Sequence, residues 1–297
     1  MPELPEVQTT VNGLHAKVLN RAFVDVWSDW EKMACLRSQV KKPADFKIFK
    51  KELKGKKIVR VWRRAKNVIF ELSGGYSLLI HMKMTGHLLV GKWEKVQGEW
   101  RSVEPGFMQE RINGFLHLIF FLDDGRMIAL SDMRKFAKVE LWKTDELFNG
   151  KEFLAWGPEP LEKSFTLKKF KEALHGKKGK IKQVIMVPQV IAGIGNIYAS
   201  EALWWARIHP EKSAARLSKK ELQALYTAIK KVLAAGIDFG GDSFSDYRNV
   251  DGEKGKFEGM KKVYQREKQP CSRCKTPIKR LKLAQRSSFY CPNCQKL

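Results

Sequence analysis

The sequence lacks several features that mark other classes of protein. None of its apolar runs approaches the roughly 20 residues that a helix needs to cross a bilayer. The opening, Met1-Pro2-Glu3-Leu4-Pro5-Glu6, is acidic and rich in turn formers, unlike a secretory signal. We also find no internal repeat. We therefore expect a cytoplasmic globular protein, and its 297 residues are enough for two domains with separate cores.

Acidic residues are scarce relative to basic ones. The chain has 56 Lys and Arg against 32 Asp and Glu, so its formal net charge is +24. A surface of this charge attracts polyanions, with salt-sensitive binding. A basic protein without a polyanionic partner is the alternative. Charge also does not distinguish nucleic acid from an anionic membrane, but no amphipathic anchor is evident, which favours nucleic acid.

Cysteine is rare outside the C-terminal end of the chain. Four of the five cysteines form the pattern Cys-x2-Cys-x16-Cys-x2-Cys at Cys271, Cys274, Cys291 and Cys294. Disulfides are disfavoured in a reducing cytosol, whereas two close thiolate pairs separated by a hairpin suit tetrahedral zinc. We therefore predict one structural Zn²⁺. Cys35 stands alone, and we interpret it as a small packing residue.

The first 150 residues have mainly β patterns. One amphipathic helix precedes them, with Val7, Val11 and Leu14 at helical spacing and Pro5 in its first turn. A hairpin is predicted at Asp123-Asp124-Gly125-Arg126, where glycine allows a positive φ. The expected strands are residues 58–62, 68–72, 77–82, 116–122 and 127–130. This predicts a β-sandwich domain over residues 1–150 with a flanking helix.

The second half of the chain has mainly helical patterns. Gly157-Pro158-Glu159-Pro160 lies in a predicted linker over residues 151–160. Ser218 and Glu221 form a capping box for a helix that we expect to end at Gly236. Two apolar helical stretches between residues 181 and 205 are joined at Gly193-Ile194-Gly195-Asn196. The fold class is thus α+β, with a helix-two-turn-helix domain over 161–265, a glycine-rich mobile loop at 240–259, and a four-cysteine zinc ribbon (zinc finger) over 266–297.

Several motifs occur together in an order typical of one family. They are Pro2-Glu3-Leu4-Pro5-Glu6-Val7, Arg63-Arg64-Ala65-Lys66, His81-Met82-Lys83-Met84-Thr85-Gly86, Gly195-Asn196-Ile197-Tyr198-Ala199-Ser200-Glu201, and Ala284-Gln285-Arg286-Ser287-Ser288-Phe289-Tyr290-Cys291. In this order the chain resembles the formamidopyrimidine-DNA glycosylases. The resemblance implies a bifunctional DNA glycosylase and AP (apurinic/apyrimidinic) lyase of base excision repair. Damaged double-stranded DNA would lie between two domains of a monomer that works on the bacterial nucleoid.

The resemblance also implies a nucleophile and its helpers. Removal of Met1 would expose the secondary amine of Pro2, and an α-amino group has a pKa of about 8 against about 10.4 for lysine. A neutral amine can attack the sugar, release an oxidised purine and leave a Schiff base that permits β,δ-elimination. Glu3 would move protons, and Lys66 would act near the sugar and its phosphate. The alternatives are a helix-leading Pro-Glu turn and a solvated strand-end lysine.

Residues of the lesion site follow from the same resemblance. Glu6 and Lys182 correspond to residues on the lesion side of the pocket, although Glu6 also suits a plain first-turn helix acid. An everted nucleotide leaves a hole in the duplex. Met84, Arg134 and Phe136 match the three void-filling residues, with apolar wedges and an arginine for the orphaned base. Met84 and Phe136 at strand ends are equally compatible with core positions.

The predicted phosphate contacts are His81, Lys178, Asn196 and Arg286, and the resemblance gives Arg286 a second role in elimination. A satisfied core histidine is the alternative for His81. Lys177, Lys178 and Lys180 together are equally typical of a solvated face. The loop around residues 251–260 corresponds to the family's lesion-capping loop.

The chain departs from the family pattern at a few positions. Lys83 and Ala137 stand where glycine is common, Phe115 replaces a histidine, Val187 replaces an acidic residue, and the segment Trp93 to Asn113 is longer than expected. Two other functions stay open. One is an endonuclease VIII-like glycosylase for oxidised pyrimidines, and the other is a non-catalytic DNA-damage-binding module.

Overall fold

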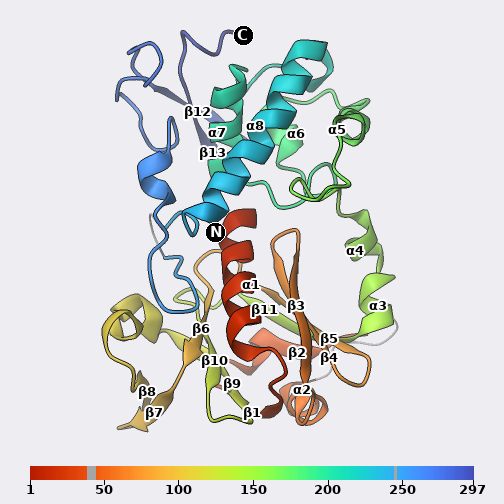
Figure 1. The fold of residues 1–297 in the computed structure, drawn as a ribbon, viewed down its shortest axis with the longest axis vertical. Coiled ribbons are helices and arrows are strands. Elements are labelled where there is room, and N and C mark those ends of the chain that lie inside the picture. Colours follow the sequence, from red (N-terminus) through yellow and green to blue (C-terminus); the bar gives the residue numbers. More distant parts are fainter. Residues whose placement is uncertain (39–44, 244–245) are drawn as a thin grey trace. The chain divides into compact units, whose positions relative to one another are not determined.

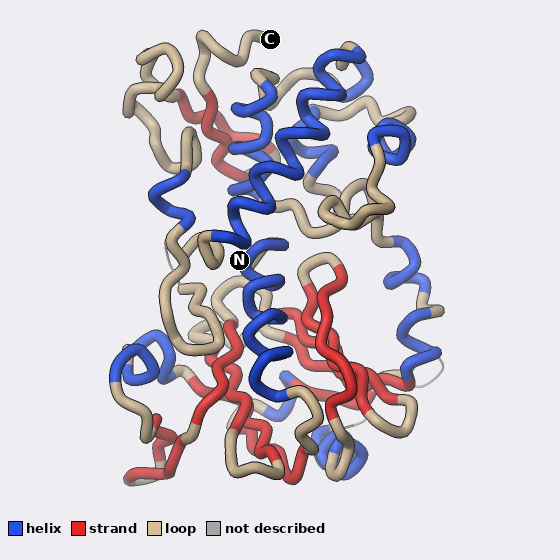
Figure 2. The backbone as a smooth tube through the Cα atoms, in the orientation of Figure 1, coloured by secondary structure: helices blue, strands red, loops and turns tan. Residues whose placement is uncertain are grey.

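The computed structural model describes residues 1–38, 45–243 and 246–297. The chain forms two compact units, which we treat separately: Met1–Leu154 with Phe239–Lys256, and Ala155–Asp238 with Phe257–Leu297 (Figures 1 and 2). Over the described ranges, no helix has the length and apolar character needed to cross a bilayer.

The first unit contains the predicted β-sandwich. One sheet has the strand order β1-β9-β10-β6 and the other β2-β11-β5-β4-β3. The buried cluster between them takes side chains from both sheets, including Phe120 and Phe70. The strands are β1 (Phe23–Ser28), β2 (Ala34–Leu36), β3 (Ile58–Arg64), β4 (Asn67–Leu72), β5 (Tyr76–His81), β6 (His87–Gly91), β9 (Leu116–Leu122), β10 (Met127–Ser131) and β11 (Lys138–Lys143).

Helix α1 (Leu4–Val18) flanks the sandwich, as predicted. Its apolar stripe, Val7, Val11 and Leu14, is buried in the same core as both sheets. Pro5 lies in the first turn, where no intrahelical N–H bond is lost. The β9–β10 hairpin also has the predicted turn, with Gly125 at φ +78°. A second helix, α2 (Phe46–Leu53), was not predicted; Phe46 and Phe49 anchor it in the core.

The long segment after β6 covers the outer face of the four-stranded sheet. It contains the hairpin β7 (Trp93–Val96) and β8 (Glu99–Ser102), then the short helices η2 (Gly106–Gln109) and η3 (Arg111–Gly114). Trp93 and Met108 pack with Leu89 and Ile119 in a second apolar cluster. The sheet is therefore buried on both faces, and we call residues 93–114 the outer-face extension.

The second unit is helical and ends in a small ribbon. Its helices are α5 (Leu167–Leu174), α6 (Ile181–Ile185), α7 (Asn196–Ala206) and α8 (Lys219–Asp238); the short helices η4 (Ala214–Arg216) and η5 (Phe257–Met260) also belong to it. The predicted capping box is present, because Glu221 N donates to Ser218 Oγ (3.2 Å) and Ser218 N to Glu221 Oε2 (2.9 Å). The ribbon is the hairpin β12 (Lys279–Leu283) and β13 (Arg286–Tyr290).

Three details differ from the expectations. Helix α8 does not end at Gly236; it continues to Asp238, since Gly236 is buried inside it. The predicted linker begins with helix α4 (Lys151–Ala155), which follows α3 (Thr144–Phe148). The third concerns the predicted glycine-rich loop, of which residues 244–245 lie outside the described ranges. Its part up to Lys256 belongs to the first unit, not to the helical one.

Candidate active site and nucleic-acid interface

The start of α1 places two carboxylates in a buried position next to Pro2. Glu3 and Glu6 are only 3% and 1% exposed, and Pro2 is buried as well. Glu3 is the N-cap, and its backbone N–H donates to Glu6 Oε2 (2.7 Å) in a capping box. Glu6 is therefore a first-turn acid, as one interpretation held, but it is also part of a buried polar site. This cap holds Pro2 and Glu3 in a defined place.

A second segment of the first unit completes the surroundings of Glu6. The backbone N–H of Asp242 donates to Glu6 Oε1 (2.7 Å), and Tyr247 Oη donates to the carbonyl of Glu6 (2.9 Å). Burial raises the pKa of Tyr247 above its ordinary value, so the phenol stays protonated and able to donate. A Cβ on Gly241, which has φ +87°, would come within 2.9 Å of Glu6 Cγ. Sequence reasoning missed this pairing, because about 235 residues separate its partners.

Lys66 lies in the two-residue turn between β3 and β4, beside α1. The pair Arg64–Asn67 closes the turn, and Ala65 adopts φ +54°. Arg63 fixes the turn to the helix, because its Nε donates to Gln8 Oε1 (3.0 Å) while its Nη1 donates to the carbonyl of Ala65 (2.9 Å). Lys66 is half-buried, so it is not the fully solvated lysine of the alternative interpretation.

His81 ends β5 as a neutral imidazole. Burial, with the positive charges of Lys83 and Lys66, lowers the pKa of His81 to about 3. Its Nδ1 accepts the backbone N–H of Lys83 (3.0 Å), so the ring proton is on Nε2. The group is suited to donate one hydrogen bond to a phosphate oxygen without adding a charge.

The three predicted void-filling side chains lie on two loops of the first unit, and all three are exposed. Met84 and Phe136 are 43% and 51% exposed, so the alternative of core positions is wrong. Arg134 is exposed too, and its guanidinium lies over the ring of Phe136 at 4.6 Å. Exposed apolar side chains next to an arginine are suited to enter a base step.

Asp132 organises these two loops, a role that sequence reasoning did not assign. It is fully buried and accepts the backbone N–H groups of Phe136 (2.7 Å) and Ala137 (2.8 Å). It also accepts the hydroxyl proton of Thr85, which joins it to the Met84 loop. Asp132, Arg134 and Phe136 have the spacing Asp-x-Arg-x-Phe. An acid four residues before a loop N–H can cap that loop, so this spacing could have indicated the contact.

Lys83, one of the departures from the family pattern, lies in the same region. It adopts φ +56°, a conformation that glycine adopts without cost. A side chain there costs about 1 kcal/mol or more of conformational strain. Gly86, three positions after Lys83, cannot carry a side chain without a backbone shift. A Cβ there would lie 2.4 Å from the carbonyl oxygen of Met82.

In the second unit, Asn196 and Arg286 are brought together. Asn196 begins α7, and its Nδ2 donates to the carbonyl of Ser287 (3.0 Å). Arg286 is exposed at the tip of the ribbon hairpin, whose turn residues Ala284 and Gln285 have φ +42° and +61°. The start of α7 thus lies against the residue that follows Arg286, and the backbone N–H groups at a helix start suit a phosphate.

Lys182 is buried instead of facing a ligand surface. It is 2% exposed, and its Nζ donates to Ser200 Oγ and Ser288 Oγ, both at 2.8 Å. A third acceptor is the carbonyl of Ser287 at 3.4 Å. The side chain therefore connects α6 and α7 to the ribbon. To contact a lesion, this ammonium group would have to give up one of its hydrogen bonds to the protein. Lys178 is exposed, as a phosphate contact or a solvated face requires.

The four C-terminal cysteines form a metal site. Their sulfur atoms lie within 4.8 Å of one another, and all four are free thiols. Tetrahedral zinc with Zn–S bonds of about 2.3 Å requires sulfur separations of about 3.8 Å, so the donor set fits. The first pair packs on α7: Trp204 Nε1 donates to Cys271 Sγ (3.4 Å), and Arg273 Nη1 donates to the carbonyl of Trp204 (2.6 Å). The protein holds one structural Zn²⁺ here.

Comparisons with known families cover nearly the whole chain. The model described as "Formamidopyrimidine-DNA glycosylase N-terminal domain" matches residues 1–139. "Formamidopyrimidine-DNA glycosylase H2TH domain" matches residues 156–248, and "Zinc finger found in FPG and IleRS" matches residues 268–297. The formamidopyrimidine-DNA glycosylase of Chloroflexus aggregans is 38% identical over 298 residues, covering 100% of this chain and 99% of the relative. That of Pediococcus pentosaceus is 35% identical over 297 residues, with 100% of both chains covered.

Solved structures agree over the full length. Lactococcus lactis Fpg in complex with an abasic site containing DNA superposes with a TM-score of 0.84 at 30% identity, covering 99% of this chain and 100% of the other. A mutant of the same enzyme with Fapy-dG containing DNA gives 0.85 at 31% identity, with both chains fully covered.

Fold, zinc ribbon and relatives together define the class: this is a zinc-containing DNA glycosylase, a DNA-binding enzyme of DNA repair. More narrowly, the chain belongs to the formamidopyrimidine-DNA glycosylase family. AP lyase activity is characteristic of that family, and the expected fold class is confirmed.

Proposed function

We propose that the enzyme removes oxidised purines, 8-oxoguanine and formamidopyrimidines, through a Schiff base on Pro2 and then cleaves the strand by β,δ-elimination. The observation that carries the proposal is the pair of buried carboxylates, Glu3 and Glu6, next to a proline at position 2. Relatives named for formamidopyrimidine and a Lactococcus lactis structure with Fapy-dG containing DNA support the choice of lesion.

The first step needs a neutral amine on a free terminus. Removal of Met1 leaves the secondary amine of Pro2 at the terminus. The amine nitrogen bonds to the sugar C1′ as the bond to the base breaks, and the departing base takes up a proton. Ring opening of the sugar leaves an iminium between Pro2 and C1′. Glu3, one residue away, is the proposed donor and acceptor of protons in these steps.

Elimination follows from the iminium, which acts as an electron sink. Loss of a proton from C2′ expels the 3′ phosphate, and a second elimination expels the 5′ phosphate. Lys66 and His81 supply positive charge and a hydrogen-bond donor on the first unit, and Arg286 and Asn196 hold phosphate on the second. Lys178 adds a further phosphate contact.

Recognition of the base falls to the first unit in this proposal. Glu6 faces the lesion, while Met84, Arg134 and Phe136 fill the space that the everted nucleotide leaves. For Lys182 the proposed lesion contact is indirect, through the ribbon that it anchors. We further propose that the enzyme works as a cytoplasmic monomer. Light scattering of the free protein, which measures its molar mass, tests the monomeric state.

Borohydride reduction in the presence of lesion DNA tests the chemistry. Trapping on a duplex with 8-oxoguanine is expected to give a covalent adduct that mass spectrometry maps to Pro2. Tight binding without any adduct would identify a non-catalytic damage-binding module. Faster incision at thymine glycol than at 8-oxoguanine would instead identify an endonuclease VIII-like specificity.

A further inference from the structure

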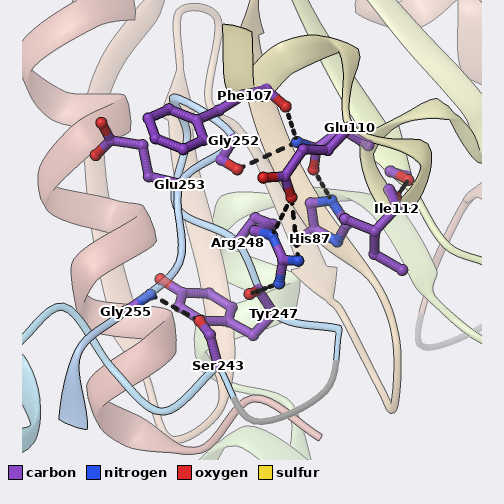
Figure 3. A network of polar contacts seen from close by, with 12 residues as sticks. His87, Phe107, Glu110, Ile112, Ser243, Tyr247, Arg248, Gly252, Glu253 and Gly255 are labelled. Atoms are coloured by element: carbon purple, nitrogen blue, oxygen red, sulfur yellow. Dashed lines mark hydrogen bonds and ion pairs between the residues drawn. The ribbon is translucent and has the colours of Figure 1, made fainter. Parts of the chain in front are cut away.

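The end of the outer-face extension contains a buried polar centre at Asn113. This side chain is fully buried. Its hydrogen-bonding groups are all used by His87, Phe107 and Gly252, which Figure 3 labels. Its Nδ2 donates to the carbonyls of Phe107 (2.7 Å) and Gly252 (3.2 Å). Its Oδ1 lies 2.8 Å from His87 Nε2. One amide therefore connects the extension, strand β6 and the segment Phe239–Lys256.

His87 fixes the orientation of that amide. The ring is fully buried, and burial lowers its pKa to about 4, so it is neutral at physiological pH. Because Asn113 Nδ2 already donates to two carbonyls, its Oδ1 must be the acceptor and His87 Nε2 the donor. The arrangement has one consistent pattern of donors and acceptors, which favours a single conformation.

A second contact of the extension lies next to the first. Arg248 is 5% exposed, and its Nη2 and Nε lie 3.2 and 3.3 Å from Glu110 Oε2. Its Nη1 donates to the carbonyl of Tyr247 (2.9 Å). The ion pair therefore holds the chain at the residue whose phenol contacts Glu6. Charge-assisted bonds of this kind are the stronger ones in proteins.

Glycines show that the fit is close on both sides. Gly252 has φ +80°, and a Cβ there would lie 2.7 Å from Asn113 Nδ2. A Cβ on Gly255 would lie 2.2 Å from the carbonyl oxygen of Gly241. The described part of the Phe239–Lys256 segment is thus clamped to the extension at 248–252, and its glycines at 241 and 255 meet near Glu6.

The extension also reaches the loop of Arg134 and Phe136. Ser131 Oγ donates to the carbonyl of Ile112 (2.8 Å), and the backbone N–H of Asp132 donates to the carbonyl of Phe115 (2.9 Å). The turn from 110 to 115 therefore supports both the Glu6 side and the void-filling side of the candidate site.

From these contacts we infer that Glu110 and Asn113 are positioning residues: they hold the described residues of the Phe239–Lys256 segment against Glu6 in the conformation that accepts the damaged base. The outer-face extension thereby takes part in lesion recognition. The inference rests on the proposed function. It assigns a task to a segment that the sequence analysis singled out for its length. The proposed mechanism gives neither residue a part in the elimination steps, so we expect elimination not to depend on them.

The test compares two substrates that differ in the presence of a base. Single-turnover incision is measured on a duplex with 8-oxoguanine and on the same duplex with a preformed abasic site. Asn113→Ala is expected to slow incision at 8-oxoguanine by up to about a hundred-fold, as a misplacement of about 1 Å can do. Its incision at the abasic site should stay near that of the unmodified enzyme.

Three further variants separate positioning from general destabilisation. Glu110→Gln keeps an acceptor for Arg248 and should lie closer to the unmodified enzyme than Glu110→Ala. Ser77→Ala removes the hydrogen bond between Ser77 on β5 and Thr144 at the start of α3 (3.0 Å) and should change neither rate. Equal losses on both duplexes, or no loss at 8-oxoguanine, would overturn the inference. An unmodified enzyme that incises neither duplex would overturn the proposed function itself, and the inference with it.

Discussion

The hydroxyl of Thr85 donates a hydrogen bond to the carboxylate of Asp132, and this contact joins the two loops that carry Met84, Arg134 and Phe136. Both partners are buried, at 5% and 0% exposure. In the proposed function these exposed side chains enter the duplex. The loops that carry them are already held by the buried contact, so DNA binding requires less ordering of the loops.

Replacement of Asp132 should lower both the stability of the fold and the affinity for DNA. In Asp132→Asn, the amide presents N–H groups toward the backbone donors of the loop. We expect the free energy of unfolding to fall by about 1–3 kcal/mol and the affinity for lesion DNA to fall with it. Urea denaturation and fluorescence anisotropy measure the two effects. Thr85→Ser, which keeps the hydroxyl, is the matched control, and an unchanged unfolding midpoint in Asp132→Asn would contradict this account.

Lys66 should contribute more to cleavage than to binding. Lys66→Ala removes the ammonium group at the β3–β4 turn but leaves the Arg63 contacts that position the turn. Single-turnover incision at an abasic site is expected to fall much further than the affinity for the same duplex. Lys57→Ala, which removes one charge from an exposed position near the other end of β3, is the control. Equal losses of rate and affinity would make Lys66 a simple phosphate contact.

Lys182 should behave as an anchor of the ribbon. Lys182→Met keeps the length of the side chain but removes three hydrogen bonds, with an expected cost of about 1–3 kcal/mol in unfolding free energy. Because the ribbon carries Arg286, affinity should fall for undamaged and damaged duplex alike. Anisotropy titrations with both duplexes decide the matter. A loss confined to the damaged duplex would show a direct lesion contact.

Zinc removal should act through the same scaffold. Cys294→Ala breaks the four-thiolate set, so we expect loss of Zn²⁺ and weaker DNA binding, because Arg286 loses its support. Metal content by atomic absorption and affinity by anisotropy are measured on the same preparation. Cys35→Ala, at a half-buried position in the first unit, should retain both. Full affinity in a demetallated protein would refute the coupling between metal and DNA contact.

The buried histidines should make the enzyme sensitive to acid. His81 and His87 have folded-state pKa values of about 3 and about 4, below the ordinary value of 6.5. The unfolded chain therefore binds more protons below pH 6.5, and stability is present above that pH and is lost as pH falls toward 4. Each histidine contributes a slope of up to about 1.4 kcal/mol per pH unit in this window.

Denaturation curves at pH 7 and pH 5 measure that slope. His87→Gln should reduce the difference between the two pH values, although the variant is itself less stable. His15→Gln, at an exposed position on α1, should keep the difference of the unmodified enzyme. An undiminished pH dependence in His87→Gln would show that other groups govern the acid sensitivity.

Local patterns in the sequence predicted much of the fold. Helix α1, the hairpin at Gly125, the capping box of Ser218 and Glu221, and the four cysteines all depend on residues a few positions apart, or on one repeated spacing. Strands β1, β2, β6 and β11 of the sandwich were not predicted. Their assignment depends on the strands beside them instead of on their own periodicity.

The exposure of single side chains in the structure decided between the interpretations that the sequence had left open. Met84 and Phe136 are of residue types that usually lie in the core, but they lie on loops that the sandwich leaves exposed. Lys182 is of a residue type that usually lies on the surface, but it is buried and donates to serine oxygens. Residue type alone could not decide either case, because burial depends on which elements pack over a position.

By itself, the sequence determined the family, the order of the elements and the metal ligands, since each rests on short-range spacing and residue chemistry. Only the tertiary structure decided that the segment Phe239–Lys256 packs with the first unit and that Asn113 meets Gly252 across 139 positions of the chain. The physical reason is that a long-range hydrogen bond forms only after whole sheets and helices have packed. Periodicity reports which face of an element is apolar, but not which distant backbone group will lie against it.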